Sequence, residues 1–303
     1  METQHDILVQ NKRDIQFKIS INRKITVIRG DSATGKSTLF QMVSDANTSS
    51  RTGVNIACDV PVVALYETGY QYELSNESGK IYVIEEDFSY LKTKEFASLV
   101  LKSDNCFIII TRESLPAIPY SYREIYKIRT SGKYHSLERI YPDYDKLTEK
   151  DMIVTEDEDA GLEYYQYFFG DKVTTSHGNS NLSKYGSQNS LLIGDGSAIG
   201  AYIQDMELTG ADMYLPESFE WKLLNNGMFK NNEKVQELIE HPERAVDTKC
   251  ISMEKYCTGL LNSITANTPA QYSKSKLNQC YVRQCCCKGT KCEYFTRDKV
   301  LDT

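Results

Sequence analysis

The chain has 303 residues, of which 40% are hydrophobic and 25% charged, and its formal net charge is −7. This composition excludes a disordered chain, and the acidic balance argues against a protein that coats DNA over its whole surface. The length suits two domains rather than one core. No apolar stretch reaches the roughly 18 residues of a membrane span, and the polar start lacks the core of a signal peptide. We therefore expect a cytoplasmic protein whose nine cysteines are reduced.

The first elements along the chain are predicted to be strands. Residues 6–28 alternate apolar and polar positions, which indicates two or three strands. The last of them, over 25–28, belongs to the stretch KITVIRGDSATGKSTLFQ, in which a buried strand turns through a glycine-rich loop into a helix beginning at Ser37. A strand, a glycine-rich loop and a helix in this order are the context that a phosphate-binding loop requires.

The loop itself predicts a nucleotide site. Its glycines let successive backbone N–H groups point at phosphate oxygens, Lys36 supplies charge to the β- and γ-phosphates, and Ser37 offers a hydroxyl to Mg²⁺. We therefore expect ATP and Mg²⁺ to bind here. The pattern G-x-x-x-x-G-K-[ST] is filled by Gly30, Gly35, Lys36 and Ser37. The candidate nucleotide-binding residues of the loop are Gly30, Asp31, Ser32, Ala33, Thr34, Gly35, Lys36, Ser37 and Thr38.

Acidic residues directly after an apolar run form a second candidate site. The run 81–84 predicts a strand, and Glu85 and Glu86 follow it. At such a position one carboxylate holds Mg²⁺ through water and the next polarises the attacking water, so we assign these catalytic roles to Glu85 and Glu86, with Glu85 also a metal ligand. The register alternatively makes Glu86 and Asp87 the working pair. In a competing interpretation these acids only cap a helix over 90–102.

A further apolar strand is predicted over 106–110, and it ends in Thr111 and Arg112. A polar residue at the tip of a strand beside the acid-bearing one can sense the γ-phosphate. Thr111 is therefore a candidate nucleotide-binding residue and Arg112 a weaker one. Two short strands, over 125–128 and 137–141, then predict a hairpin.

The strands ahead of the loop resemble the start of ABC-type ATPases. The chain carries no LSGGQ-like motif and no recognisable Q-loop. The resemblance therefore implies a reduced ABC-like ATPase that does not dimerise through that motif. Charge density rises and apolar periodicity stops over 142–151, which sets a domain boundary near Lys146.

Strands and helices alternate beyond this boundary, which predicts a small parallel sheet covered on both faces. The expected strands are 152–155, 172–176, 191–193 and 211–215, and the expected helices are 160–169 and 198–208. Glu156 follows the first strand and Asp195 the third. Because the carboxyl ends of parallel strands meet at one edge of a sheet, these two acids are expected to converge on a metal or phosphate site.

This order resembles the TOPRIM domain of topoisomerases, primases and OLD-family nucleases, in which a Glu after the first strand and an Asp-x-Asp after the third gather Mg²⁺ for phosphodiester chemistry. Glu156 and Asp195 match, whereas Ser197 stands in the place of the second Asp. Glu217 or Glu220 is then the candidate for the missing metal ligand. An ABC-like ATPase followed by a TOPRIM domain is the OLD-type plan, which is also met in bacterial anti-phage systems. The resemblance implies an ATPase that controls a Mg²⁺-dependent nuclease acting on DNA or RNA.

Two other interpretations of this domain remain open. The chain also looks like a response-regulator receiver, with Asp157 and Glu158 holding Mg²⁺ and Asp195 accepting a phosphoryl group, although no fifth strand ending in Lys is evident. The acids can also belong to a domain without catalysis, because runs of acids often begin a solvated helix. The rival function is a regulatory switch that binds ATP and signals to a protein partner or a second copy without cutting nucleic acid.

The last part of the chain is predicted to be helical, with helices over 219–228, 233–239 and 247–264. Basic and aromatic residues interleave over 271–303 and offer contacts to a nucleic acid backbone. The candidate zinc ligands of this region are Cys280, Cys285, Cys287 and Cys292. The expected fold class is α/β, with a P-loop NTPase domain over 1–146, a TOPRIM-like Rossmann-type domain over 147–225 and a helical C-terminal region over 226–303.

Overall fold

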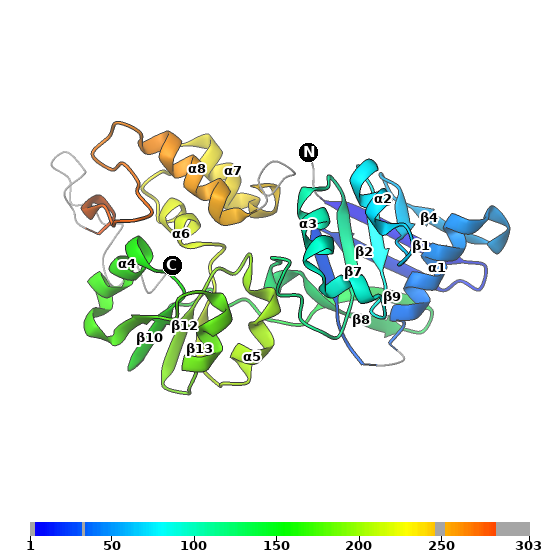
Figure 1. The fold of residues 1–303 in the computed structure, drawn as a ribbon, viewed down its shortest axis with the longest axis horizontal. Helices are drawn as coiled ribbons and strands as arrows, with labels where there is room; N and C mark the ends of the chain where they lie inside the picture. The colour runs from blue at the N-terminus through cyan, green and yellow to red at the C-terminus, as the bar shows by residue number, and fades with distance from the viewer. Residues whose placement is uncertain (1–3, 32–33, 246–251, 283–303) are drawn as a thin grey trace. The chain divides into compact units, whose positions relative to one another are not determined.

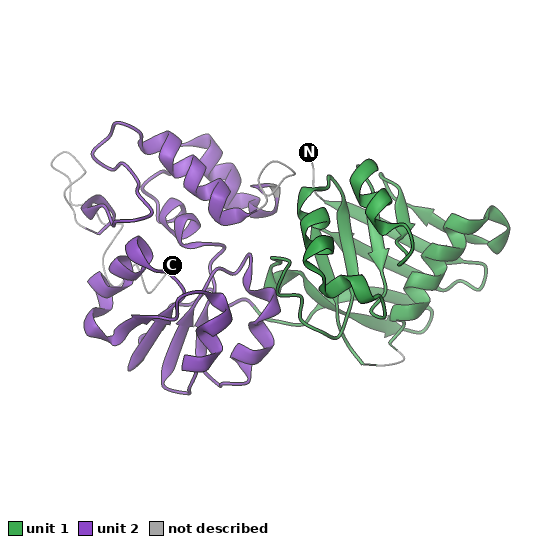
Figure 2. Cartoon of the chain, in the orientation of Figure 1, with its two compact units in different colours: residues 1–142, 246–251 green, residues 143–245, 252–303 purple. Residues whose placement is uncertain are grey.

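The computed structural model describes residues 4–31, 34–245 and 252–282. The chain divides into two compact units (Figure 2), of which the first ends at Pro142. Residues 143–245 and 252–282 belong to the second unit, so the part of the described chain after residue 225 groups with this unit rather than standing apart. Both units combine sheets with helices, which confirms the α/β fold class. No helix among the described residues has both the length and the apolar character needed to cross a membrane.

The first unit is built on one nine-stranded sheet with the order β4-β1-β2-β9-β8-β3-β7-β6-β5 (Figure 1). Its strands are β1 His5–Asn11, β2 Gln16–Ile21, β3 Ile25–Ile28, β4 Val54–Ala57, β5 Val62–Ala64, β6 Ile81–Ile84, β7 Cys106–Ile110, β8 Ile125–Ser131 and β9 Tyr134–Arg139. Its α-helices are α1 Lys36–Thr48, α2 Tyr70–Asn76 and α3 Lys94–Lys102. The predicted strands ahead of the loop are thus confirmed, whereas α2 was not foreseen.

Five strands of this sheet, β8-β3-β7-β6-β5, run parallel. β3 and β6 are buried at every position, because a parallel strand is covered on both faces and therefore reads as an unbroken apolar run. On one face, Leu39, Phe40 and Val43 of α1 pack into a core with residues of β1, β2, β3, β6 and β7. The carboxyl ends of β3, β6 and β7 consequently lie at one edge of the sheet, where the glycine-rich loop begins.

The start of the helix after β6 contradicts the interpretation in which the acids at 85–87 cap that helix. Residues Ser89–Lys92 form a 3₁₀ turn, and α3 follows with Thr93 as its N-cap. The Thr93 hydroxyl accepts a hydrogen bond of 3.1 Å from the backbone N–H of Phe96. Capping of this helix by the acids is therefore wrong, because a threonine already satisfies its first turn.

The second unit contains a four-stranded, fully parallel sheet with the order β11-β10-β12-β13. Its elements are β10 Met152–Thr155, α4 Asp159–Phe169, β11 Val173–Thr175, β12 Ser190–Ile193, α5 Ile203–Glu207 and β13 Asp212–Tyr214. From β10 the chain crosses to β11 at one end of the strand order, and from β12 it crosses to β13 at the opposite end. Because crossover connections are right-handed, α4 and α5 then cover opposite faces, and the strand order reverses between β10 and β12.

Three helices follow this sheet in the described chain: α6 Phe219–Asn225, α7 Glu233–Glu240 and α8 Met253–Thr265. α6 packs against α8 (Figure 1). The residues described after β13 add no further strand to the sheet, so the fifth strand that a receiver requires is not found among them. The expected helix over 198–208 is shorter, because a 3₁₀ turn, Ile199–Ala201, precedes α5.

Candidate functional site

The two glycines of the glycine-rich loop in the first unit have positive φ angles. Gly30 and Gly35 have φ angles of 137° and 95°, which residues with a Cβ rarely adopt. The Nζ of Lys36 donates hydrogen bonds of 2.6 Å to the carbonyl oxygens of Gly30 and Asp31. Ser37 and Thr38 are exposed at the start of α1. Ser32 and Ala33, which complete the predicted loop, lie outside the described residues.

The acids after β6 lie close to this loop. Lys36 is only 5% exposed, and burial lowers the pKa of its ammonium group, while the nearby charge of Glu86 opposes that shift. Glu86 also forms an ion pair with Arg112, with 3.1 Å between Oε1 and NH2. Glu85 is half-buried where β6 ends. The structure therefore brings the ends of β6 and β7 to the predicted phosphate loop.

Thr111 is placed at the expected strand end but has a local role. Its side chain is buried, and its backbone N–H donates to the carbonyl of Ile28 in β3. The Thr111 hydroxyl accepts a hydrogen bond of 3.0 Å from the N–H of Glu113 and donates one of 3.3 Å to its carbonyl. As a phosphate sensor the hydroxyl would have to leave this turn.

An aromatic pair beside the loop was missed in the sequence. His135 of β9 stacks on Phe17 of β2, with ring centroids 4.3 Å apart. A Cβ placed on Gly35 would lie 3.6 Å from the Nδ1 of His135, so the imidazole is directly beside the loop. The Nδ1 also bonds the Thr130 hydroxyl at 2.9 Å, and burial lowers the pKa of His135. Because β2 and β9 pair across more than 100 residues of chain, no local pattern reports this contact.

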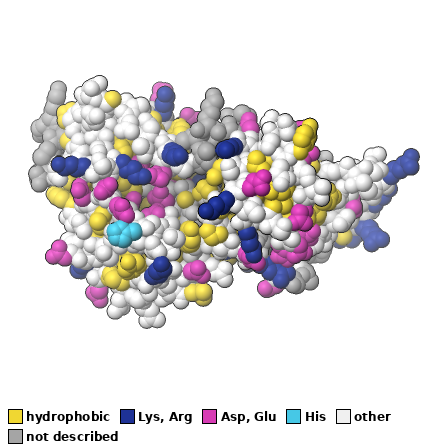
Figure 3. Space-filling model, viewed as in Figure 1, with side chains coloured by type: hydrophobic (Ala, Val, Ile, Leu, Met, Phe, Trp, Pro, Cys, Tyr) yellow, Lys and Arg dark blue, Asp and Glu magenta, His cyan; other side chains and the backbone are white. Residues whose placement is uncertain are grey.

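The second unit contains a cavity of about 340 Å³ where β10 and β12 end. Half of its lining residues are Asp or Glu, and we call it the acidic cavity. Figure 3 shows acidic side chains gathered on this face of the unit, next to basic side chains and a histidine. The lining residues are Glu156, Asp157, Glu158, Asp159, Ala160, Gly161, His177, Gly178, Asp195, Phe219, Glu220, Glu254, Tyr272 and Lys274.

The structure brings together Glu156 and Asp195, which are 39 residues apart in the sequence. Their strands pair in parallel, with Thr155 opposite Ile193, so both acids leave the sheet at the same level. The carboxylate of Glu156 accepts a hydrogen bond from the backbone N–H of Asp195. The Oδ1 of Asp195 accepts one of 3.2 Å from the N–H of Phe219 at the start of α6. Both acids lie where the strand order reverses, the position at which open parallel sheets bind ligands.

Asp157 is a third acid of the cavity, which the sequence suggested only in the receiver interpretation. Its Oδ2 accepts a hydrogen bond of 2.8 Å from the hydroxyl of Thr155. The side chain lies so close to α4 that a Cβ on Gly161 would be 2.5 Å from its Cβ and Cγ. Glycine at this position therefore permits the observed place of Asp157.

Glu220 also reaches the cavity, whereas Glu217 and Ser197 do not line it. Glu220 is 3% exposed, and its carboxylate accepts hydrogen bonds from the Tyr272 hydroxyl at 2.7 Å and from the Ser218 hydroxyl at 3.3 Å. Of the two acids considered for the missing ligand, Glu220 is thus the one that lines the cavity. Ser197 donates its backbone N–H to the carbonyl of Glu217.

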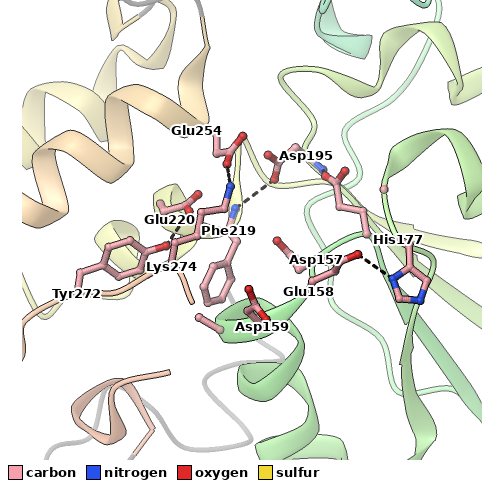
Figure 4. Close-up of a pocket in the computed structure, with 14 residues that line it drawn as sticks. Asp157, Glu158, Asp159, His177, Asp195, Phe219, Glu220, Glu254, Tyr272 and Lys274 are labelled. Atoms are coloured by element: carbon pink, nitrogen blue, oxygen red, sulfur yellow. Dashed lines mark hydrogen bonds and ion pairs between the residues drawn. The ribbon is translucent and has the colours of Figure 1, made fainter. Parts of the chain in front are cut away.

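Three lining residues come from the part of the chain after α7 and were not foreseen. Glu254 lies in the first turn of α8 and pairs with Lys274, while Tyr272 holds Glu220 (Figure 4). Across the cavity, His177 bonds Glu158 at 2.7 Å. The close-up shows the carboxylates of Asp157, Asp195, Glu220 and Glu254 facing one common space. Nothing in the spacing of these residues along the sequence indicates that they share a site.

The crowding of carboxylates changes their proton affinity. Burial, and then the charge of the neighbouring acids, raises the pKa of Glu156 and of Asp195 well above the usual range. Burial also raises the pKa of Asp157 to about 7 and that of Glu220 above its ordinary value. Burial disfavours the charge on Lys274, but the hydrogen bond to Glu254 together with the charges of Glu254, Glu220 and Asp195 outweighs burial and raises the pKa of this lysine. One lysine does not balance these acids, so the cavity favours a cation.

The cysteines bear on the predicted zinc site. Cys58, Cys106 and Cys257 are free thiols, as expected, but Cys280 is disulfide-bonded, so the expectation of reduced thiols is wrong for this residue. A disulfide-bonded cysteine offers no thiolate to zinc. The other candidate ligands, Cys285, Cys287 and Cys292, lie outside the described residues.

No protein-family model matches this chain, and none of the curated proteins matches it significantly. These comparisons assign it to no family.

Proposed function

We propose that this chain is an ATP-binding protein in which a P-loop ATPase unit, residues 4–142, controls a Mg²⁺-dependent, TOPRIM-like nuclease unit that acts on DNA or RNA, in bacterial defence against phage or mobile DNA. The observation that carries the nuclease part is the placement of Glu156 beside Asp195 in the acidic cavity. The ATPase part rests on the loop around Lys36, with Glu85 and Glu86 at the end of β6.

The donor set of the acidic cavity fits Mg²⁺. Carboxylate oxygens are the ligands that this hard cation prefers, and the excess of buried acids gives it a charge to neutralise. Glu156, Asp157, Asp195 and Glu220 would hold the ion. Bound Mg²⁺ polarises a phosphoryl oxygen and lowers the pKa of a bound water.

The other residues of the cavity have positioning roles in this proposal. Tyr272 and Ser218 fix the carboxylate of Glu220 through their hydroxyls. Among the described residues that line the cavity, Lys274 is the one lysine or arginine, and its ammonium group suits the backbone phosphate of a nucleic acid. Without a cation the acids would repel that phosphate, so substrate binding should require the metal.

In the ATPase unit, Lys36 would exchange its bonds to the carbonyls of Gly30 and Asp31 for bonds to the β- and γ-phosphates. Ser37 is exposed beside it and would offer its hydroxyl to Mg²⁺. Glu85 and Glu86 would orient and deprotonate the attacking water. Because Glu86 is paired with Arg112, hydrolysis would require that ion pair to open or Glu85 to act instead.

A nuclease assay tests the proposal. Full-length protein is incubated with single- and double-stranded DNA and RNA in the presence of Mg²⁺ or Mn²⁺, for the wild type, Glu156→Gln and the control Asp205→Asn, an exposed acid of α5. We expect metal-dependent cutting that Glu156→Gln reduces by about 100-fold or more and that Asp205→Asn leaves unchanged. Cutting that survives Glu156→Gln would remove this residue from the site.

The second candidate function is an ATP-dependent switch that signals to a protein partner or a second copy without cutting. It is favoured by Ser197, which stands in place of an acid and does not line the cavity. ATP turnover of the wild type, Lys36→Ala and Glu86→Gln, with and without DNA, separates the two. Turnover that DNA stimulates and both variants lose supports the nuclease system, whereas ATP binding with no turnover supports the switch.

A further inference from the structure

A second group of metal-ligating side chains lies in the first unit, at a pair of neighbouring strands. His5 begins β1, and Cys58 and Asp59 follow β4 directly. β1 and β4 are antiparallel, with Leu8 opposite Ala57, so the start of β1 lies beside the end of β4. One ligand atom from each of His5, Cys58 and Asp59 lies within 4.8 Å of the other two.

The three side chains already interact through hydrogen bonds. The Nδ1 of His5 is 2.9 Å from Oδ1 and 2.8 Å from Oδ2 of Asp59. The thiol of Cys58 donates to Oδ1 of the same carboxylate over 3.2 Å. The His5 nitrogen and the Cys58 sulfur thus both contact the carboxylate of Asp59. A cation could take the place of the protons in these hydrogen bonds.

We propose that His5, Cys58 and Asp59 bind a zinc ion. An imidazole nitrogen, a thiolate sulfur and a carboxylate oxygen are the three ligand types of protein zinc sites, and a thiolate selects against Mg²⁺ and Ca²⁺. With Zn–N and Zn–O bonds of about 2.0 Å and a Zn–S bond of about 2.3 Å, tetrahedral ligand atoms are roughly 3.3–3.5 Å apart. The hydrogen-bond distances to Asp59 therefore need to open by about 0.3–0.5 Å, and the His5 nitrogen and the Cys58 sulfur, which lie within 4.8 Å of each other, need to approach. Binding sends the Cys58 thiol proton to solvent and leaves His5 neutral.

The site is accessible. The side chain of Asp59 is 59% exposed, while that of His5 is 13% exposed. Cys58 and Asp59 also line an open cavity of about 620 Å³ beside α1, β4 and β5. Three protein ligands leave one tetrahedral position for water, which this access allows.

The first test is a cobalt titration of metal-free full-length protein, because Co²⁺ occupies zinc sites and its bond to a thiolate gives a charge-transfer absorption. The proteins compared are the wild type, Cys58→Ser, His5→Gln and Asp6→Asn. Asp6 is a matched control, since it adjoins His5 in β1 but bonds Ser20 instead. All four proteins keep the C-terminal cysteines, so any metal that these cysteines bind is the same in each and cancels when a variant is compared with the wild type.

We expect Cys58→Ser to bind one equivalent less metal and to lose the corresponding absorption. His5→Gln should weaken this equivalent at least about tenfold, and Asp6→Asn should bind as the wild type does. Equal stoichiometry and affinity in all four proteins would overturn the proposal.

A second measurement needs no variant. Alkylation of Cys58 by iodoacetamide is followed by mass spectrometry of the peptide that contains it. The rate without zinc is compared with the rate after zinc has been added in an amount that saturates the other cysteines and leaves one further equivalent. Bound zinc should slow the alkylation at least about tenfold, because a metal-bound thiolate is a poor nucleophile. If His5 and Asp59 form only an ion pair, zinc will not protect Cys58 from alkylation. An alkylation rate that zinc leaves unchanged would refute the zinc site.

Discussion

Asp157 can occupy its place in the acidic cavity only because residue 161 has no side chain: a Cβ on Gly161 would lie 2.5 Å from the Asp157 Cβ and Cγ. These atoms are next to the backbone and cannot swing away as the end of a flexible side chain can. The contact joins the strand-end loop to α4 and determines where one of the proposed metal ligands points.

Gly161→Ala should therefore displace Asp157. We expect the free energy of unfolding to fall by about 1–3 kcal/mol, although alanine favours helices over glycine by about 1 kcal/mol. Denaturation by urea measures the change, and a Mn²⁺ titration should show weaker binding. The control is Gly259→Ala in α8, where a Cβ would contact nothing within 4 Å and should stabilise the protein. Stabilisation by both changes would contradict the contact.

Replacement of Lys36 should weaken nucleotide binding. A charged hydrogen bond to phosphate contributes about 1.5–3 kcal/mol, so Lys36→Ala should raise the dissociation constant for ATP about 10- to 100-fold. Calorimetric titration with Mg²⁺ and ATP measures it. The control Lys127→Ala removes an exposed lysine of the same unit and should leave the affinity unchanged. Equal affinities of the wild type and Lys36→Ala would exclude the loop as the nucleotide site.

The first unit should become less stable in mild acid because of His135. Burial lowers the pKa of this residue below its ordinary value of about 6.5, so the unfolded chain binds the proton more readily than the folded one. The contribution of neutral His135 to the stability of the first unit is then fully present above about pH 6.5, and it is lost as the pH drops through the pKa that His135 has in the folded protein. His135→Phe keeps the ring that stacks on Phe17 and should flatten this dependence, as measured by unfolding midpoints at several pH values. An unchanged slope would show that His135 does not titrate in this way.

Asp195→Asn should separate stability from metal binding. Without metal the change removes the cost of burying the Asp195 carboxylate and its repulsion of Glu156, and it keeps an oxygen to accept from the Phe219 N–H, so the free energy of unfolding should rise by about 0.5–2 kcal/mol. With Mn²⁺ the wild type should gain stability and the variant should gain less. Thermal melts with and without Mn²⁺ test both effects, with Asp205→Asn as a control that alters neither. A variant stabilised by Mn²⁺ as strongly as the wild type would place the ion elsewhere.

The features that the sequence predicted are those with local causes. The loop at Lys36 follows from glycine positions within a few residues, and Glu156 and Asp195 follow from the ends of short buried strands. The partners of these groups depend on contacts across the fold. His135 reaches Gly35 through the pairing of β2 with β9, and Glu254 and Lys274 reach the cavity through the packing of α8. The place of Asp157 depends on a missing Cβ, for which an isolated glycine in a helix gives no specific signal.

The hydrogen bond from Tyr272 to Glu220 has a consequence for the integrity of the second unit. The cavity is lined by residues from both ends of the described part of that unit, since Glu156 follows its first strand and Lys274 lies beyond α8, the last α-helix of that part. A fragment that ended after α6 would keep the paired acids of the sheet but would lose the hydroxyl that orients Glu220 and the ammonium group facing the acids. The parallel sheet alone therefore does not contain the whole of the proposed cation site, which is complete only when the later part of the unit has folded against the sheet.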